Sequence, residues 1–224
     1  PLGVKIIFQI LSYSFSKKEQ NNFHKNEGER LSSSLESMGT TFIKLGQFLA
    51  TRPDIIGEEL STKLENLQDR LPPFPINYAK EIIKNDLGND TYNSIIDLSE
   101  PVAAASIAQV HKAKINDNGT IKDVAIKILR PDIKKIFNEE IDAMMLFAFI
   151  IESFVKKTKR LKLVEVVFLL KEITNLEMDL RFEAAAANEY AENTKNDVGF
   201  QVPQIYWNFT SENVMTLDWI DGVS

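Results

Sequence analysis

The sequence contains no cysteine and only two histidines, His24 and His111. Disulfide bonds, zinc–thiolate sites and cysteine nucleophiles are therefore excluded. Neither histidine stands near a second histidine or a carboxylate at the spacing typical of metal ligands, so we predict no metal site. Glycine-rich phosphate-binding motifs are absent as well, because neither G-x-G-x-x-G nor G-x-x-x-x-G-K occurs in the chain.

Long apolar runs are also missing. The opening stretch GVKIIFQILSYSF is too short to span a bilayer, and residues 141–155 are too short and carry Asp142 and Glu152. We expect a surface or interfacial helix at the first stretch and a buried helix at the second. Since the chain begins at Pro1 without methionine and ends without a stop-like tail, we expect both ends to be cut.

The composition is that of an ordinary globular protein, with 44% apolar and 26% charged residues among 224. A net charge of −6 gives no support to nucleic-acid binding, which usually requires a basic face. The lack of cysteine and of a secretory signal favours an intracellular setting.

The first half of the sequence has helical periodicity. After a polar lead-in over residues 17–30, one helix is predicted, which Pro53 ends at Arg52 or earlier. Its apolar stripe consists of Leu31, Leu35, Met38, Phe42, Leu45 and Leu49. Gly39 and Gly46 lie on one flank of this stripe, which suggests close approach by a neighbouring backbone.

A second helix is predicted over residues 58–70, with Leu60, Leu64, Leu67 and Leu71 inward. The stretch LPPFP over residues 71–75 is a stiff break, and two short helices ending near Gly88 and Leu98 are predicted after it.

The second half alternates strand and helix patterns. Residues 106–129 predict a strand, a turn at NDNGT and a second strand, in which Val124, Ile126 and Ile128 share one face. Two helices follow, roughly over 133–157 and 163–193. Residues 202–220 predict two strands around a TSEN turn. This order predicts an α+β fold with a small antiparallel sheet and a long inserted helix.

Lys127 is the first candidate for chemistry. It lies in the middle of a predicted strand among small and apolar neighbours, where a desolvated ammonium needs an anion. The alternative is a lysine at the edge of the strand whose ammonium reaches water.

The segment NLEMDLRFEAAAANEY supplies carboxylates. In the helix predicted there, Glu177 and Arg181 are four residues apart in the favourable order for an ion pair. Asp179 and Glu183 are then like charges on a shared face. A solvated acidic face would explain a single helix of this kind. However, Lys44 and Lys127 both lack an obvious local partner, so these carboxylates are candidate partners for them. Gln47 lies beside Lys44 on the side opposite the leucine stripe.

The stretch EPVAAASIAQVH carries four alanines and a serine at the entry to a strand, where a phosphate-binding loop is usually rich in glycine. By itself the stretch is simply an alanine-rich entry to a strand, stiffer than a glycine loop.

Together, the ordered motifs FIKLGQ, AAAS, VAIK, EMDLRFEAA and VMTLDWIDG resemble the UbiB/ADCK family of atypical kinase-like proteins, which serve ubiquinone (coenzyme Q) biosynthesis. The resemblance covers residues 30–224 nearly completely. It implies a helical extension over residues 29–98 after a lead-in over 1–28, and a protein-kinase-like N-terminal lobe over 99–224.

By the resemblance, Lys127 holds the nucleotide phosphates and Glu183 pairs with it. The alanine-rich loop consists of Ala103, Ala104, Ala105 and Ser106. Leu217 matches the gatekeeper, and the backbone from Asp218 to Ile220 matches the hinge that meets adenine. Lys44 and Gln47 match the K-x-G-Q signature, whereas Glu177 and Asp179 match the E-x-D signature that meets its lysine.

The resemblance implies ATP or ADP as ligand. Kinase chemistry further requires a catalytic aspartate and magnesium ligands from a C-terminal lobe, and no such motif precedes Ser224. We therefore expect Mg²⁺ only in a protein that has this lobe, and no turnover by this chain alone.

The resemblance implies a bacterial cytoplasmic or inner-membrane-face setting, or a mitochondrial one, with a membrane, a lipid or a quinone precursor as further partner. A non-catalytic helical binding module or pseudokinase at a membrane surface is the alternative, based on the aromatic opening segment and the long apolar helix.

Overall fold

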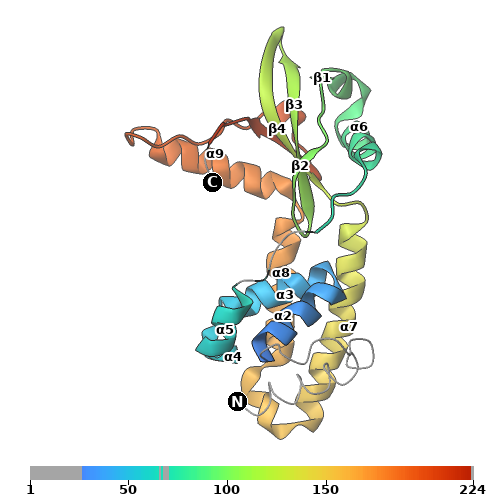
Figure 1. Cartoon of the computed structure of the whole chain (residues 1–224), viewed down its shortest axis with the longest axis vertical. Helices are drawn as coiled ribbons and strands as arrows, with labels where there is room; N and C mark the ends of the chain where they lie inside the picture. Colours follow the sequence, from blue (N-terminus) through green and yellow to red (C-terminus); the bar gives the residue numbers. More distant parts are fainter. Residues whose placement is uncertain (1–26, 66, 68–70, 223–224) are drawn as a thin grey trace. The chain divides into compact units, whose positions relative to one another are not determined.

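The structure is a computed structural model that describes residues 27–65, 67 and 71–222. It divides into two compact units, one formed by residues 1–69 and 135–174 and the other by residues 70–134 and 175–224 (Figure 1). The surface helix expected near the N-terminus and most of the polar lead-in fall outside the described residues. The segment boundaries predicted at residues 28 and 98 stay a prediction.

The described residues of the first unit form helices α2 (Glu27–Met38), α3 (Thr40–Ala50), α4 (Pro53–Ile56) and α5 (Glu58–Leu64) in its N-terminal part. The prediction of one helix through residues 31–52 is wrong, because the chain breaks at Gly39. This residue has a φ of 107°, which glycine adopts without strain. The break changes the buried face: Leu31 and Leu35 are buried, but in α3 the buried residues are Thr41, Ile43 and Gly46 instead of the leucines.

The neighbouring backbone predicted at the two glycines is not found, but Gly46 is closely approached by the side chains of Leu67 and Leu35. A methyl group at this position would collide with Leu67 and would lie 2.9 Å from Leu35 Cδ1, whereas nothing lies within 4 Å of the corresponding point at Gly39. The second helix is shorter than predicted and ends at Leu64, although Leu64 and Leu67 are buried as expected.

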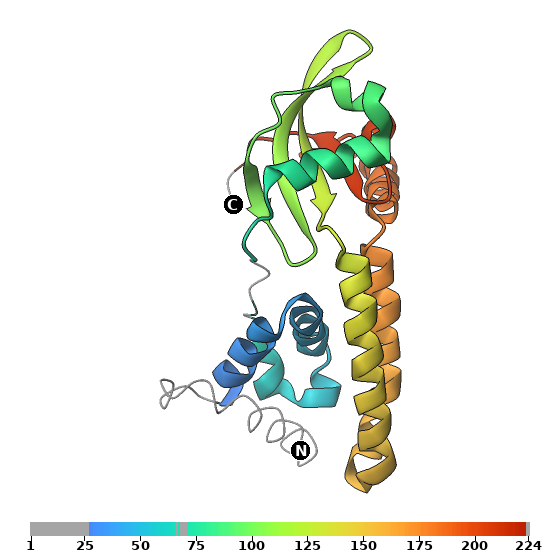
Figure 2. The same ribbon diagram turned by 90° about the vertical axis from the view of Figure 1, so that its right-hand side faces the viewer.

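A long helical hairpin follows later in the chain, formed by α7 (Ile133–Phe154), a short 3₁₀ helix η1 (Lys156–Leu161) and α8 (Leu163–Glu177). Helices α7 and α8 lie side by side in both views (Figures 1 and 2). Lys171 Nζ lies 3.3 Å from Asp142 Oδ1, and the backbone N–H of Val164 donates to Glu152 Oε1 at 3.2 Å.

Helix α7 is buried along one side only, which corrects the prediction of a buried helix over residues 141–155. Ile141, Met144 and Ala148 are buried. On the other side Leu146, Phe147, Phe149, Ile150 and Phe154 are exposed, Phe154 by 82%. None of the helices among the described residues is both long and apolar enough to span a bilayer.

The second unit is built on an antiparallel five-stranded sheet of β1 (Ile95–Ile96), β2 (Pro101–Ala104), β3 (Ala108–Asp117), β4 (Thr120–Leu129) and β5 (Val214–Asp218). The strands are ordered β1-β3-β4-β5, and β2 also pairs with β3. The predicted strand–turn–strand is confirmed. Asn118 and Gly119 form its turn with φ of 50° and 87°, as a two-residue hairpin loop requires.

Helix α6 (Ile76–Asn93) covers one face of this sheet (Figure 2). Ala79 and Ile83 of the helix are buried with the side chains of Val124, Ile126 and Ile128, which confirms that these three residues of β4 share one face and shows that it is the buried one. The helix is kinked at Gly88, whose φ is 80°, where the first of two short helices was predicted to end. The second ends earlier than predicted, because β1 begins at Ile95 and pairs with β3.

The prediction of one helix over residues 163–193 is wrong. Helix α8 ends at Glu177 and a separate helix α9 (Leu180–Thr194) begins after Asp179. Asp179 has extended backbone angles, and its carboxylate accepts from the N–H of Arg181, so it caps the new helix. Of the two strands predicted near the C-terminus, β5 is present. The other is reduced to one bridge, between Ile205 and Leu217, followed by the 3₁₀ helix η2 (Trp207–Phe209). The α+β class predicted for the chain is confirmed.

Candidate functional site

An ion pair joins the sheet to helix α9. Strand β4 carries Lys127 and the first turn of α9 carries Glu183, and Lys127 Nζ lies 2.8 Å and 2.7 Å from the two oxygens of this carboxylate. The side chains are 26% and 48% exposed, so a ligand from solvent can reach the pair. Of the two readings of Lys127, the structure supports an ammonium that is paired with an anion.

The register of the sheet gathers the other candidates around Lys127. Val110 of β3 lies opposite both Lys127 and Ala103, and Leu217 of β5 lies opposite Ala125. Residues directly opposite each other in antiparallel strands share a face, and so do residues two apart in one strand. Ala103, Lys127 and Leu217 are therefore on the same face, opposite the one that α6 covers.

The alanine-rich loop connects β2 to β3 as a tight turn. The N–H of Ala105 donates to Ala108 O at 2.8 Å, and the Arg130 guanidinium donates to Ala105 O from Nε at 3.1 Å and from Nη2 at 2.9 Å. Ser106 is fully buried, whereas Ala103 is exposed. A ligand can therefore reach this loop most easily at Ala103, whereas the N–H and C=O of Ala105 are already bonded and Arg130 restrains the turn.

The segment predicted as the hinge is held by its own neighbours. The Asp218 carboxylate accepts from Tyr206 Oη at 2.6 Å and from the N–H of Gln204 at 3.1 Å. Burial, together with this hydrogen bond to Asp218, raises the pKa of Tyr206, so the phenol keeps its proton. The backbone N–H groups of Asp218 and Trp219 donate to Gln204 O and Asp123 O. Ile220 follows and is 44% exposed.

Lys112 is a residue of this face that the sequence analysis did not identify. It lies opposite Ala125, and its Nζ is 4.6 Å from the centroid of the Trp219 ring. This cation–π contact places a second lysine beside the hinge segment. The alternation of buried and exposed residues in β3 was the available signal, since His111 and Ala113 on either side of Lys112 point into the core.

The two signatures fall in different units, so their predicted meeting stays a prediction. Lys44 and Gln47 are half-buried in α3 of the first unit, whereas Glu177 and Asp179 belong to the second. The structure corrects the reasoning on the carboxylates, because Glu177 and Arg181 are not on one helix. Arg181 instead binds Asp179, with Nε 2.9 Å from Oδ1 and Nη2 2.6 Å from Oδ2. This bidentate pair lowers the pKa of Asp179.

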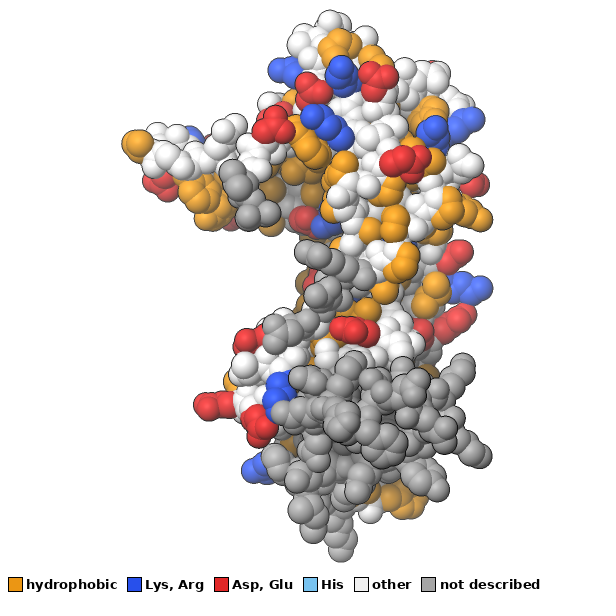
Figure 3. All heavy atoms as spheres, viewed as in Figure 1, with side chains coloured by type: hydrophobic (Ala, Val, Ile, Leu, Met, Phe, Trp, Pro, Cys, Tyr) orange, Lys and Arg blue, Asp and Glu red, His pale blue; other side chains and the backbone are white. Residues whose placement is uncertain are grey.

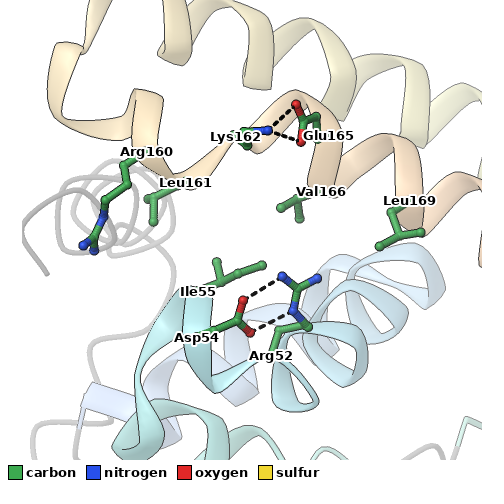
Figure 4. A pocket seen from close by; sticks show the side chains of 9 residues that line it. All are labelled: Arg52, Asp54, Ile55, Arg160, Leu161, Lys162, Glu165, Val166 and Leu169. Carbon is green, nitrogen blue, oxygen red and sulfur yellow. Dashed lines mark hydrogen bonds and ion pairs between the residues drawn. The ribbon is translucent and has the colours of Figure 1, made fainter.

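A separate cavity of about 430 Å³ lies within the first unit (Figure 4). Two ion pairs line it, Arg52 with Asp54 and Lys162 with Glu165, together with Arg160 and the apolar side chains of Ile55, Leu161, Val166 and Leu169. The hydrogen bond from Arg52 lowers the pKa of Asp54, and that to Glu165 raises the pKa of Lys162. Since each pair neutralises itself, we assign no ligand to this cavity.

Charges of both signs are interspersed over β3 and β4 on the face in Figure 3, while hydrophobic side chains lie at the surface along α9. Among the described residues there is no group of three or more His, Asp or Glu side chains placed to hold a metal ion. The described residues thus do not form a magnesium site, and we assign no step to this ion.

The sequence is similar both to one family model and to several curated proteins. The family model for the ABC1 atypical kinase-like domain matches residues 66–224. "Probable protein kinase UbiB" of Marinobacter nauticus is 37% identical over the whole of this chain and 40% of the relative. Relatives of the same name from Vibrio cholerae and Cellvibrio japonicus are 37% and 34% identical over 88% of the chain and 36% of each relative. The chain spans about 40% or less of the length of these curated relatives.

Proposed function

The chain belongs to the ABC1 atypical kinase-like family, and we propose that its second unit binds an adenine nucleotide, ATP or ADP, on the sheet face that carries Lys127. The observation that carries the proposal is the contact of Lys127 with Glu183, beside the alanine-rich loop. A lysine ammonium held by a carboxylate of a neighbouring helix is the arrangement with which kinase-like proteins hold the α- and β-phosphates.

In this proposal each group has a defined part. The Lys127 ammonium binds phosphate oxygens, and Glu183 holds the ammonium in position. The backbone of Ala103 to Ala105 lies along the phosphates, and Leu217 lies at the back of the adenine site. Because the N–H groups of Asp218 and Trp219 are already bonded, we propose the N–H of Ile220 as the donor to adenine.

The place of the whole protein in metabolism is also a proposal. The motifs resemble proteins of ubiquinone biosynthesis, and the relatives are named probable protein kinases. We therefore propose that this chain is part of an atypical kinase or ATPase that supports ubiquinone biosynthesis. Lys44 and Gln47 are proposed to meet Glu177 or Asp179 as the regulatory signature of that protein.

Titration calorimetry of the 224-residue chain with ADP, ATP and adenosine tests nucleotide binding. The expected result is binding of ADP or ATP and weaker binding of adenosine, which lacks phosphates. Lys127→Ala should weaken ADP binding roughly tenfold or more, because a charge-assisted contact to phosphate is lost. Lys122→Ala is the matched control, since Lys122 is an exposed lysine of the same strand. Equal affinity of both variants for ADP would contradict the role of Lys127.

A second candidate function, docking to an anionic membrane surface, is favoured by the distal half of α7. At 100° per residue, its exposed Leu146, Phe147, Phe149, Ile150 and Phe154 form one arc, which is interrupted only by Ser153. The chain then continues through η1 and Lys162 with the sequence KKTKRLK. An exposed apolar arc followed by a basic cluster is typical of segments that lie on anionic bilayers.

Co-sedimentation with vesicles of phosphatidylglycerol and phosphatidylcholine separates this candidate from nucleotide binding. We expect Phe154→Ser and Arg160→Glu to reduce binding. Tyr78→Ser and Lys195→Glu, which change an exposed aromatic and an exposed lysine of the second unit, should not. If all four variants bind as the wild type does, the α7 surface is not the docking site.

A further inference from the structure

Helix α9 is anchored to the second unit through its beginning. Leu180 and Ala184 are its buried residues, and the helix then extends away from the sheet (Figure 1). Glu183 lies in its first turn. The contacts that hold this turn therefore decide whether the Glu183 carboxylate reaches Lys127.

The turn formed by Ser211, Glu212 and Asn213 holds the first residue of α9. The N–H of Leu180 donates to Glu212 O at 2.9 Å, so one otherwise unsatisfied donor of the helix terminus is bonded. The N–H of Leu129 donates to Asn213 O at 2.9 Å. The same turn thus binds both the end of the strand that carries Lys127 and the start of the helix that carries Glu183.

The Glu212 side chain adds electrostatic contacts at this point. It pairs with Lys134 at the start of α7, and its Oε2 lies 4.0 Å from Arg181 Nη2. Arg181 in turn binds Asp179, the N-cap of α9. The carboxylates of Asp179 and Glu212 therefore flank one guanidinium in the first turn of the helix.

Asp86 of α6 holds the turn from the opposite side. Its Oδ2 accepts from Ser211 Oγ at 2.7 Å, from the N–H of Asn213 at 3.2 Å and from Asn213 Nδ2 at 3.0 Å. A partly buried carboxylate that accepts three such bonds fixes a short turn more firmly than backbone bonds alone. The contacts form a continuous path from α6 through the turn to α9.

We propose that Asp86 and Glu212 are positioning residues that orient the first turn of α9 so that Glu183 meets Lys127. Neither residue touches the ion pair, and both act through the turn at 211–213. The inference rests on the proposed function in one respect, the assignment of the Lys127–Glu183 pair to phosphate binding. The positioning itself is measurable without any nucleotide.

The acetylation rate of Lys127 is a suitable measure, because a lysine held by a carboxylate reacts more slowly than one that is released. The 224-residue chain is treated with the N-hydroxysuccinimide ester of acetic acid, and peptide mass spectrometry follows Lys127, with exposed Lys114 as internal standard. The Glu183→Gln variant defines the rate for an unpaired Lys127. Hydrogen exchange at the Leu180 amide measures separately how firmly the 211–213 turn holds the first residue of α9.

We expect Asp86→Ala and Glu212→Gln to move the Lys127 rate at least halfway from the wild-type value to that of Glu183→Gln. Leu180 should exchange faster in Asp86→Ala. The controls Asp90→Ala, an exposed carboxylate of α6 beyond the kink at Gly88, and Glu189→Gln, an exposed carboxylate on α9, should keep the wild-type rate.

A wild-type Lys127 rate in both positioning variants would overturn the proposal, whether or not the Leu180 amide exchanges faster. If circular dichroism shows that Asp86→Ala does not fold, Glu212→Gln decides, since this side chain is 48% exposed and its backbone carbonyl is retained. The reagent needs no nucleotide, so failure of the proposed function has a different signature: the expected acetylation pattern without ADP binding.

Discussion

Replacing Asp179 separates two contributions to the start of α9. The Asp179 carboxylate accepts from the N–H of Arg181 at 3.1 Å as the helix N-cap, and it also binds the Arg181 guanidinium. Asp179→Ala removes both contacts. Asp179→Asn keeps an oxygen that can cap the helix but removes the charge.

The expected magnitudes follow from these contacts. Loss of an Asp N-cap costs about 1 kcal/mol, whereas asparagine caps about as well as aspartate. The ion pair adds little, because Arg181 is solvent-exposed and its charge is screened. A loss of about 1 kcal/mol corresponds to roughly a fivefold change in the opening equilibrium of the helix.

Hydrogen exchange of the first-turn amides of α9 measures this equilibrium. We expect exchange about fivefold faster in Asp179→Ala and nearly unchanged in Asp179→Asn at neutral pH. Glu189→Ala, in the exposed part of the same helix, is the control for a lost carboxylate. If exchange is as fast in Asp179→Asn as in Asp179→Ala, the charge dominates and the capping argument is wrong. If exchange in Asp179→Ala is no faster than in Glu189→Ala, Asp179 does not hold this helix.

Three further predictions concern other parts of the chain. Burial lowers the pKa of His111 below its usual 6.5. Below about pH 6.5 the unfolded chain therefore binds more protons than the folded chain, so urea unfolding should show a free energy of unfolding that falls as the pH drops. The fall should be smaller in His111→Gln. Gly46→Ala should lower the free energy of unfolding, because overpacking against Leu67 costs about 1–3 kcal/mol and the better helix former returns at most about 1 kcal/mol; Leu67→Ala in the same chain should reduce the loss. Ala104→Gly should loosen the alanine-rich loop and change the ratio of ATP to ADP affinity in calorimetry, and an unchanged ratio would show that the loop does not contact phosphate.

The sheet was predictable because alternation has a simple physical cause. Val124, Ile126 and Ile128 are buried on one face, and the Asn118–Gly119 turn fixes the register of β3 and β4. In this register Lys127 lies on the face opposite these three residues, as predicted. Glu183 reaches it from a helix more than fifty residues later. The residues offered Glu177, Asp179 and Glu183 together as candidate partners, and the resemblance singled out Glu183.

The helix boundaries were less predictable, because a continuous apolar pattern does not show where backbone angles change. Gly39 fits the helical pattern but takes a positive φ, whereas Gly46, seven residues on, is a true close-packing site. Asp179 also lies inside a helical pattern. Aspartate is a favourable N-cap, and this was the available signal for the break between α8 and α9.

The sequence could not show which side of the distal half of α7 is buried, because residues 143–151 are all apolar and therefore give no indication of which side is covered. The contacts through which Asp86 and Glu212 position α9 could not be predicted from the sequence either. They depend on the tertiary meeting of α6 with a turn 125 residues later in the chain, and neither residue stands in a recognisable motif.

Nuclear magnetic resonance of the chain titrated with ADP tests the central claim most directly. If the Lys127 face binds nucleotide, shifts should concentrate on the Lys127 side chain, the backbone of Ala103 to Ala105 and the Ile220 amide, and Lys127→Ala should abolish them. Shifts confined to other residues, or the same shifts in Lys127→Ala, would contradict the assignment of this face as the nucleotide site.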